Sequence, residues 1–121
     1  MTAHPNRLKD YLGHVVTAIE RIERYTGDMT EPVFLDDERT QDAVVRNLEI
    51  IGEASRNIER HAPEFAAAHP ELPLAAAYQM RNAVAHGYFK VDLPVVWRTV
   101  RNDLPALKAH VLAAAAGLDL F

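Results

Sequence analysis

Three residues in one short segment have side chains suited to chemistry on phosphate esters: Arg81, His86 and Tyr88. A histidine that titrates near neutral pH can take or give a proton, as general acid–base catalysis requires. The planar guanidinium of arginine binds phosphate oxygens and stabilises negative charge that develops in a transition state. No carboxylates cluster around the three residues in the sequence, so the pattern indicates metal-free cleavage of a phosphodiester through attack by a ribose 2′-hydroxyl.

The spacing between Arg81 and His86 predicts a helix that ends at the histidine. Five residues correspond to about 140° around an α-helix, so an unbroken helix would not place both side chains on one face. Gly87 favours a helix end at His86, where the negative end of the helix dipole stabilises the imidazolium. Tyr88 then adds a phenolic hydroxyl. Asn82 either orients phosphate or caps helix carbonyls, and the sequence leaves both roles open.

The arginine–histidine spacing is a weak signal by itself, because Arg56 and His61 share it. Ten arginines and six histidines in this chain give roughly 0.5 such pairs by chance. Only the pair Arg81–His86 is followed by a tyrosine two residues later. Requiring that tyrosine lowers the chance expectation to roughly 0.02, so the complete motif is the more specific signal.

Two acidic residues are weaker candidates for a supporting role. Glu49 and Glu53 are four residues apart, so they share one face of the helix predicted over this region. They either orient Arg81 or His86 from a neighbouring helix or form part of a solvated face. The solvated face is the more common arrangement for such a pair.

Basic and aromatic residues after the motif also allow two interpretations. Arg98 and Arg101, with Lys90, either extend a basic strip for RNA or form a solvated helix face paired with Asp103. Trp97 fits a core or dimer-interface anchor better than a platform for stacked bases. The sequence does not decide between the two roles of the arginines.

The composition excludes several classes of site. The chain has no cysteine, which excludes disulfides, thiol nucleophiles and thiolate metal ligands. The remaining histidines have no spacing typical of metal ligands, so we expect neither a metal nor a cofactor; they are His4, His14, His61, His69 and His110.

The length of the chain indicates a single domain over residues 1–121. The formal net charge of −4 argues against broad phosphate tracking and leaves room for a local basic site. The first residues are polar, and no apolar run approaches the roughly 20 residues of a membrane helix. We therefore expect a cytoplasmic protein without a signal peptide.

Hydrophobic spacings of three and four predict helices throughout, with no segment that reads as a strand. The predicted fold class is an all-α, antiparallel four- to five-helix bundle. A loop is expected over residues 28–35, a turn over residues 69–73, and a kink or break at Pro105. The expected helices cover residues 5–26, 36 or 37 to 61, 63–68, 74–85, and the region from Asp92 onward.

The Arg81-x4-His86-x-Tyr88 pattern resembles that of the HepT-like toxins, a branch of the HEPN superfamily. The resemblance extends over about residues 7–112. It includes four further stretches: Phe34 to Val44, Arg46 to Ala54, Val91 to Trp97, and Leu104 to Leu107.

The resemblance implies a HEPN-like bundle that dimerises and brings two copies of the motif together across a cleft. It also implies a metal-independent ribonuclease, with tRNA as a known substrate class. The implied partner is a minimal nucleotidyltransferase (MNT) antitoxin, which transfers AMP from ATP to the motif tyrosine. In this chain, Arg81 would bind phosphate, His86 would be the acid or base, and Tyr88 would be modified.

Two other functions compete with the ribonuclease toxin. The first is a catalytically inactive helical binding module that partners a nucleotidyltransferase or binds nucleotide, and the net charge of −4 favours it. The second is a purely structural helical dimer, which the complete motif disfavours.

Overall fold

The computed structural model describes residues 5–79 and 92–118, and this part of the chain contains helices and no strand. The all-α prediction is therefore confirmed. The elements are α1 (Pro5–Thr26), α2 (Glu31–Leu35), α3 (Glu38–His61), α4 (Pro63–Ala68), a helical segment at residues 74–79, α6 (Leu93–Arg98), the π-helical turn η1 (Thr99–Asp103) and α7 (Leu104–Gly117).

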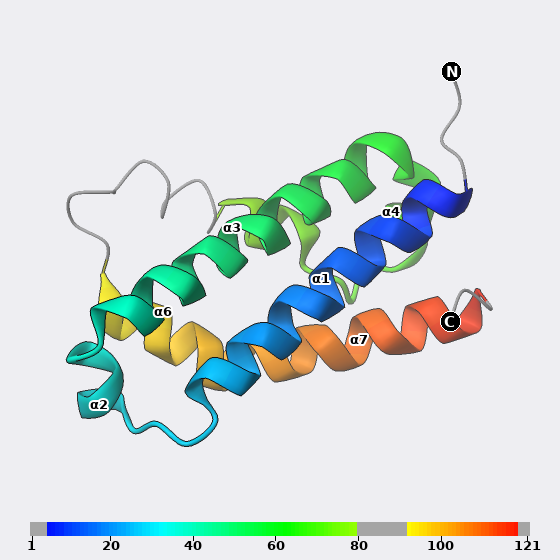
Figure 1. The fold of residues 1–121 in the computed structure, drawn as a ribbon. Helices are drawn as coiled ribbons and strands as arrows, with labels where there is room; N and C mark the ends of the chain where they lie inside the picture. The colour runs from blue at the N-terminus through cyan, green and yellow to red at the C-terminus, as the bar shows by residue number, and fades with distance from the viewer. Residues whose placement is uncertain (1–4, 80–91, 119–121) are drawn as a thin grey trace.

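The long helices pack side by side around one apolar core. Helix α1 runs antiparallel to α3 along one flank and antiparallel to α6–η1–α7 along the other (Figure 1). Burying each large apolar side chain contributes about 1.5–3 kcal/mol relative to its exposure. The largest fully buried apolar side chains come from α1, α2, α3 and α7: Leu12, Val15, Ile19, Ile22, Phe34, Val44, Leu48, Ile51, Ile58 and Val111. Within the described residues, no helix combines the length and hydrophobicity that crossing a bilayer requires.

Helix α3 begins as the sequence predicts, directly after an aspartate. Asp37 is the N-cap: one carboxylate oxygen accepts a hydrogen bond from the backbone N–H of Thr40 at 3.0 Å, and the other accepts from its hydroxyl at 2.9 Å. The backbone hydrogen bond, followed by the hydroxyl hydrogen bond, lowers the pKa of Asp37 below its ordinary value. The ionised cap therefore stabilises the folded state.

This cap makes the protein less stable in acid. The pKa of Asp37 is lower in the folded state than in the unfolded state, so its contribution is present above the unfolded value and is lost as pH falls through the folded value. Asparagine also caps helices but carries no charge. We expect the urea-unfolding midpoint at pH 7 to be higher for the wild type than for Asp37→Asn. This difference between the two midpoints should disappear well below about pH 4. A gap of constant size at both pH values would contradict this role for Asp37.

The expected loop over residues 28–35 is wrong in part, because Glu31–Leu35 forms the short helix α2. Pro32 lies in its first turn, where no intrahelical amide donor is needed. Phe34 is fully buried, with its ring centroid 5.2 Å from that of Trp97. Its carbonyl accepts a hydrogen bond from Gln41 Nε2 at 2.9 Å. Tertiary contacts thus hold a helix that is too short to produce a periodic pattern.

The predicted irregularity at Pro105 is confirmed as a π-helical turn. Thr99–Asp103 forms η1, and the N–H of Leu104 donates to the carbonyl of Thr99, five residues back. Pro105 lies in the first turn of α7, where its missing N–H does not break the hydrogen-bond ladder. This wider turn contains one residue more than an α-helical turn. The helix can therefore continue past Pro105 and along α1.

Arg101 has a structural role that neither sequence interpretation included. Its Nη2 atom lies 2.7 Å from the carbonyl oxygens of both Thr26 and Met29, at the C-terminal end of α1. The guanidinium carbon lies 4.3 Å from the centroid of the Trp97 ring, in a cation–π contact. Trp97 itself is buried, which confirms it as a core anchor. Arg101 therefore connects η1 to the end of α1.

Replacing Arg101 by glutamine is expected to lower the free energy of unfolding by about 1–2 kcal/mol. The loss includes two hydrogen bonds from a charged donor and one cation–π contact, and it is discounted because the side chain is exposed. Arg98→Gln on neighbouring α6 is the control, with an expected change within about 0.5 kcal/mol. Equal urea-unfolding free energies for the two variants would show that Arg101 does not stabilise this junction.

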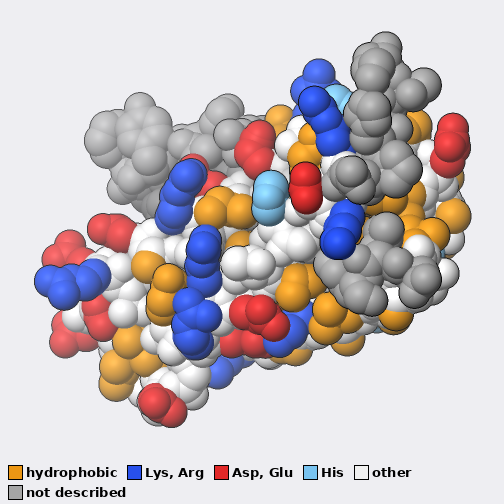
Figure 2. All heavy atoms as spheres, turned by 45° about the vertical axis from the view of Figure 1, so that its right-hand side comes forward, with side chains coloured by type: hydrophobic (Ala, Val, Ile, Leu, Met, Phe, Trp, Pro, Cys, Tyr) orange, Lys and Arg blue, Asp and Glu red, His pale blue; other side chains and the backbone are white. Residues whose placement is uncertain are grey.

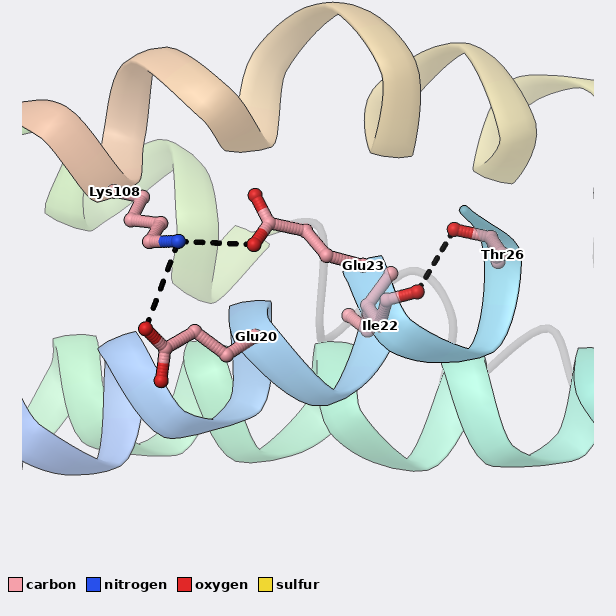
Figure 3. Close-up of polar contacts among 5 residues, drawn as sticks. All are labelled: Glu20, Ile22, Glu23, Thr26 and Lys108. Carbon is pink, nitrogen blue, oxygen red and sulfur yellow. Dashed lines mark hydrogen bonds and ion pairs between the residues drawn. The ribbon is translucent and has the colours of Figure 1, made fainter. Parts of the chain in front are cut away.

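A second polar connection joins α7 to α1 (Figure 3). Lys108 Nζ lies 2.9 Å from Glu23 Oε1 and 3.6 Å from Glu20 Oε2. The hydrogen bond to Glu23 is the main reason that the pKa of Lys108 is raised. One turn further along α1, the buried hydroxyl of Thr26 donates to the carbonyl of Ile22 at 2.8 Å. The contacts of Lys108 connect α7 to α1, whereas the Thr26 hydrogen bond lies within α1.

Candidate functional site

The predicted motif residues Arg81, Asn82, His86 and Tyr88 lie outside the described residues. The chain on both sides of the motif is described. Residues 74–79 form a helix before it, and α6 begins after it. Asp92 caps α6, its Oδ1 accepting a hydrogen bond from the N–H of Val95 at 3.2 Å.

The helical segment before the motif is held against α3 by an aromatic contact. The guanidinium carbon of Arg56 lies 4.5 Å from the centroid of the Tyr78 ring. Because Tyr78 precedes Arg81 by three residues, this contact fixes where the chain enters the motif segment.

The second arginine–histidine pair of the sequence makes packing contacts instead of forming a site. Arg56 lies over Tyr78, and the His61 ring stacks on Tyr11 of α1, with centroids 5.9 Å apart and planes at 26°. The two members of the pair thus contact different parts of the fold.

A polar hollow of about 240 Å³ lies between α1 and the outer side of α3. Helix α3 lines most of it, because residues spaced three and four apart share one helical face. Helix α1 contributes a single side chain, His14. The lining residues are His14, Arg46, Glu49, Ile50, Glu53, Ala54 and Asn57. The sequence therefore correctly placed Glu49 and Glu53 together, and the structure adds basic and amide groups beside them.

The hollow presents both hydrogen-bond donors and acceptors. Glu49 and Asn57 are partly buried, whereas Arg46 and His14 are exposed. Within the described part of the chain, Arg46, Glu49 and Asn57 make no hydrogen bond or ion pair with other side chains or the backbone. A carboxylate only accepts hydrogen bonds and a guanidinium only donates them, so a ligand with both kinds of group would match this hollow.

Charge is unevenly distributed along the chain. Helices α1 and α3 together carry eight Lys or Arg and eight Asp or Glu residues, so the net charge of −4 comes from the rest of the sequence. The connection between them is acidic, with four Asp or Glu and no Lys or Arg over residues 28–37. Figure 2 shows Lys and Arg side chains arranged in a column on one face of the molecule, with Asp and Glu side chains on both sides of it. The long helices therefore repel a polyanion less strongly than the net charge of −4 implies.

A larger, mostly apolar groove of about 510 Å³ lies elsewhere, between residues 71–77 and the η1–α7 helix. At its edge, His69 Nδ1 lies 2.9 Å from Glu71 Oε2, and this hydrogen bond lowers the pKa of Glu71. His110 also lines the groove. Among residues 5–79 and 92–118, no three His, Asp or Glu side chains are arranged to hold a metal ion.

Comparison with known sequences identifies the family of this chain. The family model described as "Ribonuclease HepT-like" matches residues 15–114, a range that includes the whole motif. The chain belongs to the HepT-like ribonuclease family. Its membership agrees with the resemblance that the motif and its flanking stretches showed.

Several relatives in this family carry ribonuclease names. A protein of Thermococcus cleftensis named "Probable ribonuclease HepT" is 48% identical over 100 residues, covering 83% of this chain and 88% of the relative. A protein of Caldanaerobacter subterraneus subsp. tengcongensis, named as a "Putative RNase", is 36% identical over 104 residues, covering 85% of this chain and 89% of the relative.

A third HepT-like relative is longer than this chain. This Methanocaldococcus jannaschii protein, named "Gamma-glutamylcyclotransferase and putative RNase", is 40% identical over 93% of this chain, which spans 49% of the relative. No solved structure matches this chain.

Sequence reasoning missed three of the polar residues that line the hollow: His14, Arg46 and Asn57. The sequence did indicate two of them, because Arg46 lies three residues before Glu49 and Asn57 lies four residues after Glu53, which places all four on the same face of α3. His14 lies on a different helix, and only the packing of α1 on α3 places it there.

Proposed function

We propose that this HepT-like protein is a metal-independent ribonuclease, with Arg81 and His86 as catalytic residues. The observation that carries the proposal is the family match over residues 15–114, which spans the complete Arg81-x4-His86-x-Tyr88 motif. The ribonuclease names of relatives at 48% and 36% identity support it. Asn82 is proposed to assist Arg81 at the phosphate.

In the proposed reaction, a ribose 2′-oxygen attacks the adjacent phosphorus, and the bond from phosphorus to the 5′-oxygen of the next nucleotide breaks. A general base takes the 2′-hydroxyl proton and a general acid protonates the leaving 5′-oxygen. Arg81 stabilises the added negative charge on the phosphate oxygens. The products are a 2′,3′-cyclic phosphate and a 5′-hydroxyl.

The single motif histidine in each chain favours a homodimer for this chemistry. The base and the acid act on opposite sides of the phosphorus, so two imidazoles fill the roles more easily than one. We propose that two copies of the chain place His86 of each at a shared cleft. Glu49 and Glu53 are proposed as supporting residues.

We also propose that the protein is the toxin of a toxin–antitoxin pair, silenced at Tyr88 by a cognate nucleotidyltransferase. The phenolic oxygen would attack the α-phosphorus of ATP, forming tyrosyl-AMP and releasing pyrophosphate. The added group is bulky and negatively charged, and it lies seven residues along the chain from Arg81, so it would compete with an anionic substrate. Transfer RNA is the proposed substrate class.

The test is incubation of the purified protein with total RNA in excess EDTA, with RNA ends read by sequencing. The protein is prepared without the nucleotidyltransferase, and its intact mass is checked for AMP. We expect defined new ends bearing a 2′,3′-cyclic phosphate. If unmodified protein makes no new ends, the ribonuclease proposal is wrong. That outcome supports the alternative, a binding module for the nucleotidyltransferase or a nucleotide, with which the net charge of −4 is consistent.

A further inference from the structure

We propose that the hollow between α1 and α3 binds one unpaired guanine base of the RNA substrate, with Glu49 and Arg46 as the residues that select it. This inference rests on the proposed ribonuclease function and assigns it a specificity site. The hollow is lined by His14 and by six residues of α3.

The size of the hollow fits a single base. Pockets for drug-sized ligands occupy about 300–1,000 Å³, whereas this hollow has about 240 Å³. Ile50 and Ala54 supply an apolar wall and the other lining residues supply polar groups. A flat heterocycle with polar edges matches that combination better than a bare phosphate or an extended peptide does.

The polar groups favour guanine over the other bases. The Watson–Crick edge of guanine carries two adjacent donors, N1–H and N2–H, which match the two acceptor oxygens of a carboxylate such as Glu49. Its other edge carries two acceptors, O6 and N7, which arginine binds bidentately. Arg46 lies in the same hollow, and the Asn57 amide offers a further donor. Adenine, cytosine and uracil each lack the pair of adjacent donors.

The hollow and the anchor of the chain that leads to the motif both lie along α3. Asn57, which lines the hollow, is the neighbour of Arg56 on α3. Arg56 holds Tyr78, and Tyr78 precedes Arg81 by three residues. A base in the hollow would therefore lie against the same stretch of α3 that anchors the entry to the motif segment.

An aromatic row continues from the hollow along the two helices. The rings of His14 and Tyr11 meet edge to face at 6.4 Å, and Tyr11 stacks on His61 at 5.9 Å. Single-stranded RNA is commonly recognised by polar contacts to base edges together with aromatic faces for stacking. This row offers a surface for the nucleotides that flank the bound guanine.

The test measures binding of fluorescently labelled ten-nucleotide oligouridines that contain one central guanine or one central adenine. Fluorescence anisotropy is read in EDTA with the His86→Ala protein, so that cleavage does not interfere. We expect the guanine oligonucleotide to bind about tenfold more tightly, because one good bidentate contact discriminates bases by about that factor. Glu49→Gln and Arg46→Gln are each expected to remove most of this preference.

Matched controls lie on the same helix outside the hollow. Glu59→Gln replaces another partly buried α3 glutamate, and Arg39→Gln replaces another exposed α3 arginine. Both are expected to leave the ratio of guanine to adenine affinity unchanged, even if Arg39→Gln weakens binding to all RNA. Equal binding of the two oligonucleotides, or an unchanged ratio in Glu49→Gln and Arg46→Gln, would overturn the inference.

The inference and the ribonuclease proposal fail in different experiments. Absence of cleavage by unmodified protein counts against the ribonuclease and leaves the binding ratio measurable. Cleavage without any preference for guanine, in binding and at the mapped ends, would reject the guanine site while leaving the ribonuclease proposal in place.

Discussion

Replacing His86 by alanine is expected to lower the rate of RNA cleavage about a thousandfold or more. General acid–base catalysis by a positioned histidine contributes roughly 10²–10⁴-fold, and a dimer of the variant loses the group from both copies. The rate is measured in excess EDTA with an RNA whose cut position has been mapped. Tyr88→Phe is the companion variant, and we expect it to cleave while remaining unable to accept AMP.

Two controls keep this result interpretable. The urea-unfolding midpoint of His86→Ala should match the wild type, which excludes loss of fold as the cause. His61→Ala removes the histidine of the other arginine–histidine pair, whose ring stacks on Tyr11, and it should cleave at close to the wild-type rate. If His86→Ala cleaves normally at the same position, His86 is not the catalytic acid or base.

The second large effect concerns stability. Phe34→Ala is expected to lower the free energy of unfolding by about 3–5 kcal/mol. The side chain is fully buried and packs against Trp97, so its removal leaves a cavity between α2 and α6. A domain of this size is stabilised by only about 5–15 kcal/mol in total. Urea unfolding followed by circular dichroism measures the change.

The control comes from the same short helix. Val33 is 51% exposed, so Val33→Ala should change the free energy of unfolding by no more than about 0.5 kcal/mol. A similar small loss in both variants would mean that α2 does not pack on the core as the structure shows.

Long helices and their ends were predictable from local chemistry. The expected ranges of α1 and of the C-terminal end of α3 agree with the structure, because apolar spacing and the positions of Gly27 and Pro63 mark these bounds. The start of α3 was expected at Asp36 or Asp37, and the structure shows Asp37 as its cap. The residues that determine these helix ends lie within one helical turn of them, so they can be recognised in the sequence alone.

Features that depend on distant contacts were not predictable in the same way. Helix α2 has only five residues, and the packing of Phe34 on Trp97 stabilises it across 63 positions of sequence. The contacts of Arg101 with Thr26 and Met29 span more than 70 positions. Within the candidate site, the α3 residues share a readable spacing, but His14 joins them only through packing of α1 on α3.

The separation of charge described above has a kinetic consequence for the encounter with RNA. An electrically neutral pair of long helices joined by an acidic connection at residues 28–37 gives the molecule a permanent dipole. In the field of a polyanion, that dipole turns the acidic connection away before contact, so the opposite end of the α1–α3 pair meets the polyanion first. Added salt shortens the reach of this orienting torque to about a Debye length.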